Sequence, residues 1–193
     1  LIAAAKKNGS ANFPQDDDGV IRRSPTAIFF EGPKHVYPSL VMAGGMDFLG
    51  IPTDGFDYDF DDLVLRLSDT TGTVVREIPI DEQGRMYVNY YGPFKTFYYL
   101  PYLYCVNPEM LPPDYWEDKV AIVGASLPGL MDLRNTPVQE TFAGVEIHAN
   151  VMHSILQNEF VSITDSHTNL IMILLLSVVL GAVVSIPPKP LWS

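Results

Sequence analysis

The longest apolar stretch of the chain is its clearest structural signal. Residues 170–186, from Leu170 to Ile186, carry no charge. A helix of that length would extend ~25 Å, at the short end of what crosses a bilayer core. A buried core helix is the alternative for such a stretch. Because the stretch is apolar on every side of a helix and follows a soluble-looking segment, we interpret it as a transmembrane helix.

Apolar residues recur at helical spacing in the part of the chain that precedes this stretch. Residues 39–49 are predicted to form one helix, with Pro38 at a plausible first helical position and Gly50 after its end. Residues 145–160 are predicted to form another, and residues 98–106 a short one. The helix at 145–160 is expected to pack on a sheet through an apolar face that contains Val145, Ala149, Met152, Ile155 and Leu156.

Short alternating or apolar segments bounded by turn residues predict β-strands. Residues 73–80 and 85–91 flank turn residues at 81–84, so we expect a hairpin there, toward an edge of the sheet. The other expected strands are residues 1–5, as the end of a strand, and residues 20–23, 26–30 and 63–67.

Residues 119–123 (KVAIV) form a compact apolar run that ends at Gly124. This pattern is typical of a buried parallel strand that leads into a loop. We therefore predict an α/β fold: a mixed sheet with this segment as its central parallel strand, flanking helices, and then the transmembrane helix.

Acidic residues outnumber basic ones. The chain has 23 Asp and Glu against 12 Lys and Arg, a net charge of −11. Such a charge disfavours binding to nucleic acid and to anionic lipid surfaces, so we expect no nucleic-acid partner. The single cysteine, Cys105, excludes an intrachain disulfide and does not decide the compartment.

Several short motifs follow one another in a characteristic order. They are DGVIRR (18–23), YPSL (37–40), IDEQG (80–84), NYYGP (89–93), DKVAIVGA (118–125), GLMD (129–132), TP (136–137) and GVEIHAN (144–150). In this order they resemble the CHASE2 domain, over about residues 1–165, which correspond to the C-terminal part of that domain.

The resemblance implies an extracytoplasmic sensor domain of a bacterial receptor, which regulates a cytoplasmic domain not present in this chain. An adenylate or guanylate cyclase is the expected output, because residues 89–93 and 96–97 look more like the cyclase-linked sequences. A histidine kinase, a serine/threonine kinase and a diguanylate cyclase are the alternatives within the family. A class III cyclase output would make the receptor a homodimer. A membrane-anchored binding protein without catalytic output is an alternative of another class.

The expected organisation follows from the motifs and the apolar stretch. Residues 1–160 would form the sensor domain without its N-terminal part, and residues 161–169 a linker. Residues 170–186 would span the bilayer of the inner membrane, and residues 187–193 would begin a loop. We expect residues 1–169 outside the cytoplasm, and Lys189 after the span fits the positive-inside tendency.

A candidate ligand site follows the predicted strand at 119–123. Open α/β sheets bind ligands beyond the carboxyl ends of their strands, and glycine-rich turns offer backbone N–H groups to anions or polar molecules. The alternatives are that the glycines only permit tight turns, that Asp132 only caps a neighbouring element, and that the histidine only packs. The predicted ligand-binding residues, for an unidentified small-molecule or envelope signal, are Gly124, Ala125, Ser126, Asp132, Thr136 and His148.

The other segments give weaker indications of a functional site. Residues 16–19 superficially resemble a calcium loop but lack the distal Glu, and no second His or Cys accompanies His148 at metal-ligand spacing, so we expect no metal. Residues 57–62 alternate acidic and aromatic side chains, as a solvated loop does. The aromatic residues between 87 and 104 would form an interaction surface or, as we favour, a packed face. No hydrolase, phosphate-loop or zinc-protease motif occurs, so we expect no catalytic residue and no cofactor in this chain.

Overall fold

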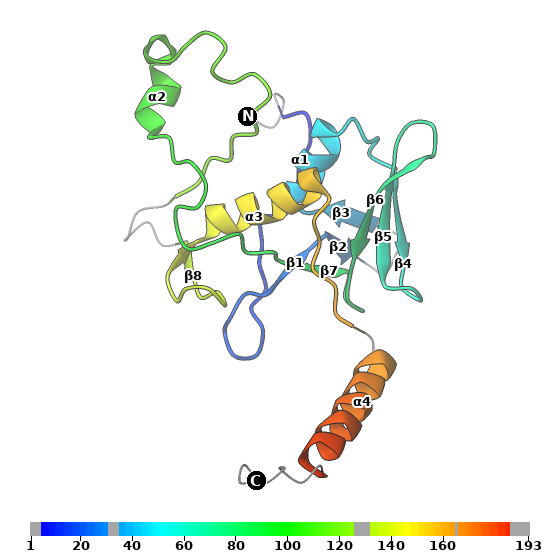
Figure 1. Ribbon diagram of the computed structural model, residues 1–193. Coiled ribbons are helices and arrows are strands. Elements are labelled where there is room, and N and C mark those ends of the chain that lie inside the picture. Colours follow the sequence, from blue (N-terminus) through cyan, green and yellow to red (C-terminus); the bar gives the residue numbers. More distant parts are fainter. Residues whose placement is uncertain (1–4, 31–34, 126–131, 165, 186–193) are drawn as a thin grey trace, which may run out of the picture. The chain divides into compact units, whose positions relative to one another are not determined.

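The computed structural model describes residues 5–30, 35–125, 132–164 and 166–185 (Figure 1). The chain divides into two compact units, Leu1–Val161 and Ser162–Ser193. The first unit is a mixture of helices and small antiparallel sheets, and the described part of the second unit contains one long helix.

Every pair of strands described in the first unit is antiparallel. The pairs are β1 (Arg23–Pro25) with β7 (Arg85–Tyr87), β2 (Ala27–Phe30) with β3 (His35–Pro38), β4 (Phe56–Asp59) with β5 (Val64–Ser68), β5 with β6 (Val74–Pro79), and β8 (Leu133–Arg134) with β9 (Phe142–Ala143).

The alternation along β5 explains why the three-stranded sheet forms. Leu65 and Leu67 are fully buried, and the residues between and beside them are only half-buried, so one face of the strand points into the core. Ile78 of β6 lies opposite Leu65 and is also fully buried. The two strands therefore contribute paired apolar side chains to the same interior.

Two helices pack against each other beside these sheets. In α1 (Leu40–Phe48), the side chain of Ser39 caps the first turn by accepting a hydrogen bond from the Met42 N–H. The partner is α3 (Gly144–Gln157). A Cβ at Gly45 would lie 3.0 Å from Cγ2 of Ile155, so the absence of a side chain there lets the helices approach closely. Both helices were predicted, although Pro38 belongs to β3 and not to the helix.

The core lies between α1, α3 and the inner faces of the sheets. It also contains Ile21, which precedes β1, and Phe142 of β9, both fully buried. Its other large buried members are Val41, Met42, Met46, Ile51, Leu65, Leu67, Ile78, Met86, Ile147, Val151 and Ile155.

The prediction of a hairpin at residues 81–84 is only partly right. A tight turn does form: Asp81 N–H donates to the Arg85 carbonyl, and Gly84 adopts a positive φ of 70°. The strands that it connects belong to different sheets, because β6 pairs with β5 and β7 pairs with β1. The local sequence determined the turn, and the choice of strand partners depended on distant segments.

The prediction of a central parallel strand at residues 119–123 is wrong. These residues form no strand, and the side chain of Val123 is 76% exposed. A strand needs a neighbour for its backbone N–H and C=O groups, and no described strand lies beside this segment. A five-residue apolar run is compatible with several environments, and here only Ile122 packs against the core.

The buried face of α3 differs from the predicted one. Ile147, Val151 and Ile155 point into the core, whereas Val145 and Leu156 are only half-buried. Ala149 is half-buried as well, and Met152 and Ile155 are buried as expected. The helix is covered on a wide arc, so the core-facing row cannot be separated from its neighbours by spacing alone.

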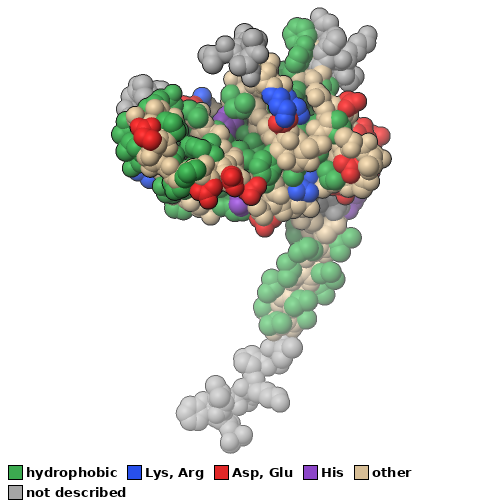
Figure 2. Space-filling view, turned by 90° about the horizontal axis from the view of Figure 1, so that it is seen from above, with side chains coloured by type: hydrophobic (Ala, Val, Ile, Leu, Met, Phe, Trp, Pro, Cys, Tyr) green, Lys and Arg blue, Asp and Glu red, His purple; other side chains and the backbone are tan. Residues whose placement is uncertain are grey.

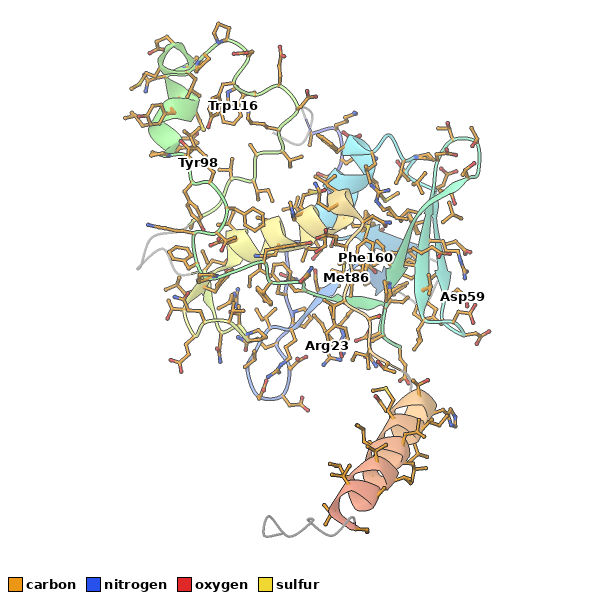
Figure 3. The ribbon with its side chains drawn as sticks, in the orientation of Figure 1. Arg23, Asp59, Met86, Tyr98, Trp116 and Phe160 are labelled. Carbon is orange, nitrogen blue, oxygen red and sulfur yellow. The ribbon has the colours of Figure 1, made fainter. Side chains whose placement is uncertain are left out.

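A segment with little buried surface follows β7. It contains α2 (Tyr102–Val106) and a 3-10 turn, Pro108–Met110, and neither has a buried residue. Figure 3 shows Tyr98 and Trp116 on this segment, apart from Met86 of the core and from Phe160, which packs against the core. The aromatic cluster is thus divided: Tyr90 and Phe94 pack against the core, while Tyr98 is 81% exposed.

The second unit contains α4 (Ser166–Ser185). Residues His167–Ser185 are long and apolar enough to cross a membrane, with a mean hydropathy of 2.3. Figure 2 shows hydrophobic side chains along the visible face of this helix. The helix therefore fits a transmembrane segment. Ile186 and residues 187–193, and residues 1–4 of the expected first strand, lie outside the described residues.

Candidate ligand-binding site

Two of the predicted site residues lie against the first turn of α3. The carbonyl of Asp132 accepts a hydrogen bond of 2.7 Å from the N–H of Gly144, and the carboxylate of Asp132 occupies the space where a Cβ of residue 144 would lie. Gly124 contacts the same turn, because a Cβ there would be 2.6 Å from Cβ of Val145. Residue 144 therefore has to be glycine for Asp132 to reach the start of the helix.

His148 lies one turn further along α3 and is almost entirely buried. Its ring lies 4.3 Å from the ring of Phe13, centroid to centroid, and it also forms a hydrogen bond to the backbone of Ala11. Its Nδ1 has no hydrogen-bond partner in the described structure. Burial lowers the pKa of His148, and the charge of Asp132 acts in the opposite direction. The imidazole is therefore held in its neutral form, with one ring nitrogen unused.

The remaining predicted residues behave differently. The Thr136 hydroxyl donates to the Gln139 carbonyl at 2.8 Å and accepts from the Gln139 N–H, so it closes a local turn. Ala125 is exposed in an irregular segment, and Ser126 lies outside the described residues. The structure thus brings Gly124, Asp132 and His148 to the start of α3, and it assigns the Thr136 hydroxyl to its own loop.

A buried polar row on α3 was missed in the sequence. Glu146, Asn150 and Ser154 are each spaced by four residues and are almost fully buried. The Glu146 carboxylate accepts hydrogen bonds from the N–H groups of Lys95 and Phe97 and from the hydroxyl of Tyr99. The spacing itself was the signal: three polar residues lie four apart in a helix that also has a long apolar row.

Asn150, the next residue of this row, also binds the segment that contains residues 91–99. The side-chain oxygen of Asn150 accepts a hydrogen bond from the Tyr91 N–H at 3.0 Å. The Tyr91 hydroxyl donates to the carboxylate of Glu159, beyond the end of α3. The row therefore fixes residues 91–99 along the length of α3, and these residues lead into the exposed segment that contains α2.

A second polar site lies at the loop that was compared with a calcium site. Its carboxylates bind arginines of the same chain: Asp18 accepts from both terminal nitrogens of Arg22, at 2.9 and 2.7 Å. Asp16 accepts from Arg22 and Arg23. The guanidinium of Arg22 lowers the pKa of Asp18 to about 2. Burial alone would raise the pKa of Asp16, but the hydrogen bonds from both arginines outweigh it and lower that pKa.

The ion pairs continue across the two strands β1 and β7. One carboxylate oxygen of Asp81 accepts from Arg23 at 3.1 Å and from Arg85 at 2.8 Å. The other accepts from the N–H groups of Gln83 and Arg85. Arg85 also donates to the side-chain oxygen of Gln83 at 2.9 Å. Asp81 thus joins the turn before β7 to the strand β1.

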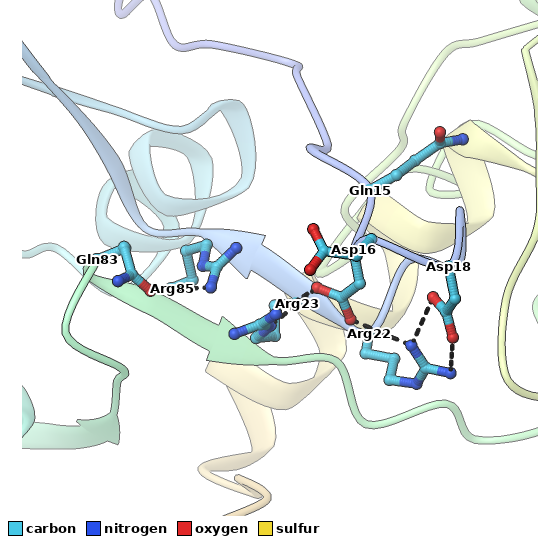
Figure 4. A pocket seen from close by; sticks show the side chains of 8 residues that line it. Gln15, Asp16, Asp18, Arg22, Arg23, Gln83 and Arg85 are labelled. Carbon is cyan, nitrogen blue, oxygen red and sulfur yellow. Dashed lines mark hydrogen bonds and ion pairs between the residues drawn. The ribbon is translucent and has the colours of Figure 1, made fainter.

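Several of the side chains around these ion pairs line an open polar pocket of about 530 Å³ (Figure 4). In the close view Arg23 lies between the Gln83–Arg85 side and the Asp18–Arg22 side. The residues that line the pocket are Gln15, Asp16, Asp17, Asp18, Arg22, Arg23, Gln83 and Arg85. We call it the charged pocket.

The strand β7 also contacts the end of the first unit. Tyr87 forms an isolated antiparallel bridge with Val161, the last residue of that unit. Because β7 pairs with β1 on its other side, the charged pocket and the point where the chain leaves the unit share one strand. Among the described residues, no group of three or more His, Cys, Asp or Glu side chains is placed to hold a metal ion.

Comparison with known proteins gives one match. The family model of the CHASE2 domain matches residues 1–182, which include the whole first unit and most of α4. No curated protein and no solved structure matches the chain. The resemblance predicted from the motifs is confirmed, and the chain belongs to the CHASE2 family of extracellular sensor domains.

Proposed function

We propose that this chain is the extracytoplasmic signal-sensing input domain of a bacterial transmembrane receptor. The observation that carries the proposal is the extent of the family match, which runs through the globular unit into the apolar helix α4. A sensor domain joined directly to a membrane-spanning segment can pass a change in its own structure to that segment. The chain would lie in the inner membrane, with the bilayer in contact with residues 170–186.

The proposed ligand site of the sensor lies at the start of α3, with Gly124, Asp132 and His148. Ala125, Ser126 and Thr136 belong to the site predicted from the sequence, and Ser126 lies outside the described residues. The support for the proposed site is the unused Nδ1 of the buried His148, together with the closeness of Asp132 and Gly124 to the same helix turn. A small polar molecule could satisfy that nitrogen. Asp132→Ala and His148→Ala should each abolish the response to the signal, and unchanged signalling in both variants would contradict this site.

The proposed output is a class III adenylate or guanylate cyclase domain not present in this chain. Such cyclases form their active sites between two catalytic domains, so the receptor would act as a homodimer. A small shift of α3 would be passed through residues 161–169 to the membrane span. This requires an element with two arrangements whose balance the ligand changes.

The experiment that tests the output is expression of the full-length gene in a host without its own cyclase. Cyclic AMP or cyclic GMP above the empty-vector level is the expected result. No cyclic nucleotide from an intact, membrane-inserted protein would exclude the cyclase. A kinase assay on the same membranes would then separate a histidine or serine/threonine kinase from a membrane-anchored binding protein without output.

Topology needs a separate experiment. Protease added to spheroplasts should digest the unit Leu1–Val161 if residues 1–169 lie outside the cytoplasm. Protection in spheroplasts, with digestion only after lysis, would reverse the proposed orientation.

A further inference from the structure

We propose that the charged pocket binds a small zwitterion, such as a free amino acid or a short peptide. Its volume of about 530 Å³ is within the range of small-molecule sites. It shares no lining residue with the site proposed at the start of α3, so the two can be tested independently.

The balance of charge in the pocket argues for a ligand without net charge. Its walls hold three aspartates and three arginines, in a chain whose net charge is −11. The three carboxylates balance the three guanidinium groups, so the pocket itself favours neither a lone anion nor a lone cation. A molecule that carries one ammonium and one carboxylate group matches this balance.

Two groups of the pocket remain available to such a ligand. Arg85 uses Nε on Asp81 and Nη2 on Gln83, which leaves its Nη1 without an acceptor among the described residues. Asp17 is exposed, and its carboxylate forms no hydrogen bond or ion pair within the described part of the chain. We assign the ligand carboxylate to Arg85 and the ligand ammonium group to Asp17, because charged hydrogen bonds between such groups are strong.

The surrounding ion pairs hold the Arg85 side chain in place. The carboxylate of Asp81 accepts hydrogen bonds from the side chain and from the backbone N–H of Arg85. Only 18% of the Arg85 side chain is exposed. Asp16 and Asp18 neutralise Arg22 and Arg23, so a ligand carboxylate does not face an excess of positive charge. Because Arg85 is already held by these contacts, its side chain loses little entropy when a ligand binds.

The position of the pocket gives binding a direct structural consequence. Arg85 lies in β7, two residues before Tyr87, which bridges Val161 at the end of the unit. A ligand bound to Arg85 would therefore stabilise β7. This strand contacts Val161, where the chain leaves the first unit toward the membrane span.

The test measures binding to the full chain in lipid nanodiscs by calorimetry. The zwitterionic probes are L-alanine, L-glutamine and glycylglycine. Propionate and ethylamine, which carry only one of the two charges, serve as matched ligands. At least one zwitterion should bind, and both single-charge compounds should bind about tenfold or more weakly.

Variants locate the two contacts. Asp17→Asn and Arg85→Gln should each weaken zwitterion binding about tenfold or more. Arg66→Gln is the control, because Arg66 forms ion pairs on β5 and does not line the pocket. Arg85→Gln also breaks an ion pair with Asp81, whereas Asp17→Asn removes no contact in the described structure, so its result is decisive if the other variant unfolds.

Three outcomes would overturn the proposal. They are no binding of any zwitterion up to about 10 mM, equal binding of propionate, which would indicate a simple anion site, and unchanged affinity in Asp17→Asn.

Discussion

Glu146 shows how a single residue joins two parts of the fold. The residue is only 1% exposed, yet its carboxylate has no arginine or lysine partner among the described residues. Its hydrogen bonds come from two backbone N–H groups and Tyr99. Burial and the charge of Glu146 raise the pKa of Tyr99, which keeps that hydroxyl protonated as a donor.

Replacing Glu146 by Ala should therefore destabilise the first unit by about 1–3 kcal/mol, because two partly buried N–H groups lose their acceptor. Chemical unfolding of the full chain would measure this, and protease cleavage within residues 97–118 should become faster. Glu77→Ala is the control, since that side chain is 65% exposed and makes a single long ion pair. A stability equal to the unmodified protein would mean that the contacts to Lys95 and Phe97 contribute nothing.

His148 predicts a pH dependence of stability. Its pKa in the folded chain lies below the ordinary value of 6.5, so the unfolded chain binds the proton more readily. Stability should therefore be complete above pH 6.5 and decrease as the pH falls from 6.5 toward the folded pKa.

The measurement is the free energy of unfolding at pH 7.5 and at pH 5.5, in the unmodified chain and in His148→Gln. The decrease between the two values should be smaller in the variant. The lowered pKa of Asp18, about 2, places its own contribution at more acidic pH, so the two effects are separable. An identical decrease in both proteins would assign it to other groups.

At the scale of elements, α3 depends on contacts at both of its ends. Its first turn accommodates Asp132 only because residue 144 is glycine. Its last turn has free carbonyls, and Arg76 of β6 donates to two of them, Ile155 at 2.8 Å and Leu156 at 3.0 Å. Asn158 then ends the helix in the left-handed conformation.

Arg76→Met should cost about 1–3 kcal/mol, since two partly buried hydrogen bonds from a charged donor are lost while the aliphatic stem is kept. Amide hydrogen exchange should become faster in the last turn of α3 and remain unchanged in α1. Arg66→Met is the matched control, because that arginine binds only carboxylates near the surface and such pairs contribute little. Equal exchange rates in both variants would argue against capping by Arg76.

At the scale of the whole molecule, the contrast between the two units is the main feature. The first unit buries its apolar side chains, whereas none of the described residues of α4 is buried in the structure. An apolar helix with its side chains outward needs a nonpolar surrounding, which a bilayer supplies.

Leu175→Arg places a charge near the centre of α4. In a membrane-spanning helix this should cost about 2.5–3.5 kcal/mol on insertion, and part of the protein should be lost from carbonate-washed membranes. Leu175→Ala controls for the loss of side-chain volume. Full retention of the arginine variant in the membrane would contradict a spanning position for residue 175.

The sequence by itself determined the features that depend on near neighbours. These features are the apolar run of α4, the apolar spacing of α1 and α3, and the turn at Asp81–Arg85. The order of short motifs also sufficed for the family. For the candidate site, the sequence placed Asp132 and His148 after a strand that does not form. In the structure Asp132 lies beside Gly144 in the first turn of α3, and His148 lies one turn further along the helix.

Only the tertiary structure decided which segments became partners. The strand β7 could have paired with β6, its neighbour in the chain, but it pairs with β1, about sixty residues away, where Asp81 binds Arg23. Likewise, the acidic residues at 16–18 and the arginines at 22, 23 and 85 form a pocket only because these two strands meet. The physical reason is that a backbone N–H or a charged side chain accepts any suitable partner, and which partner it meets is determined by how the whole core packs.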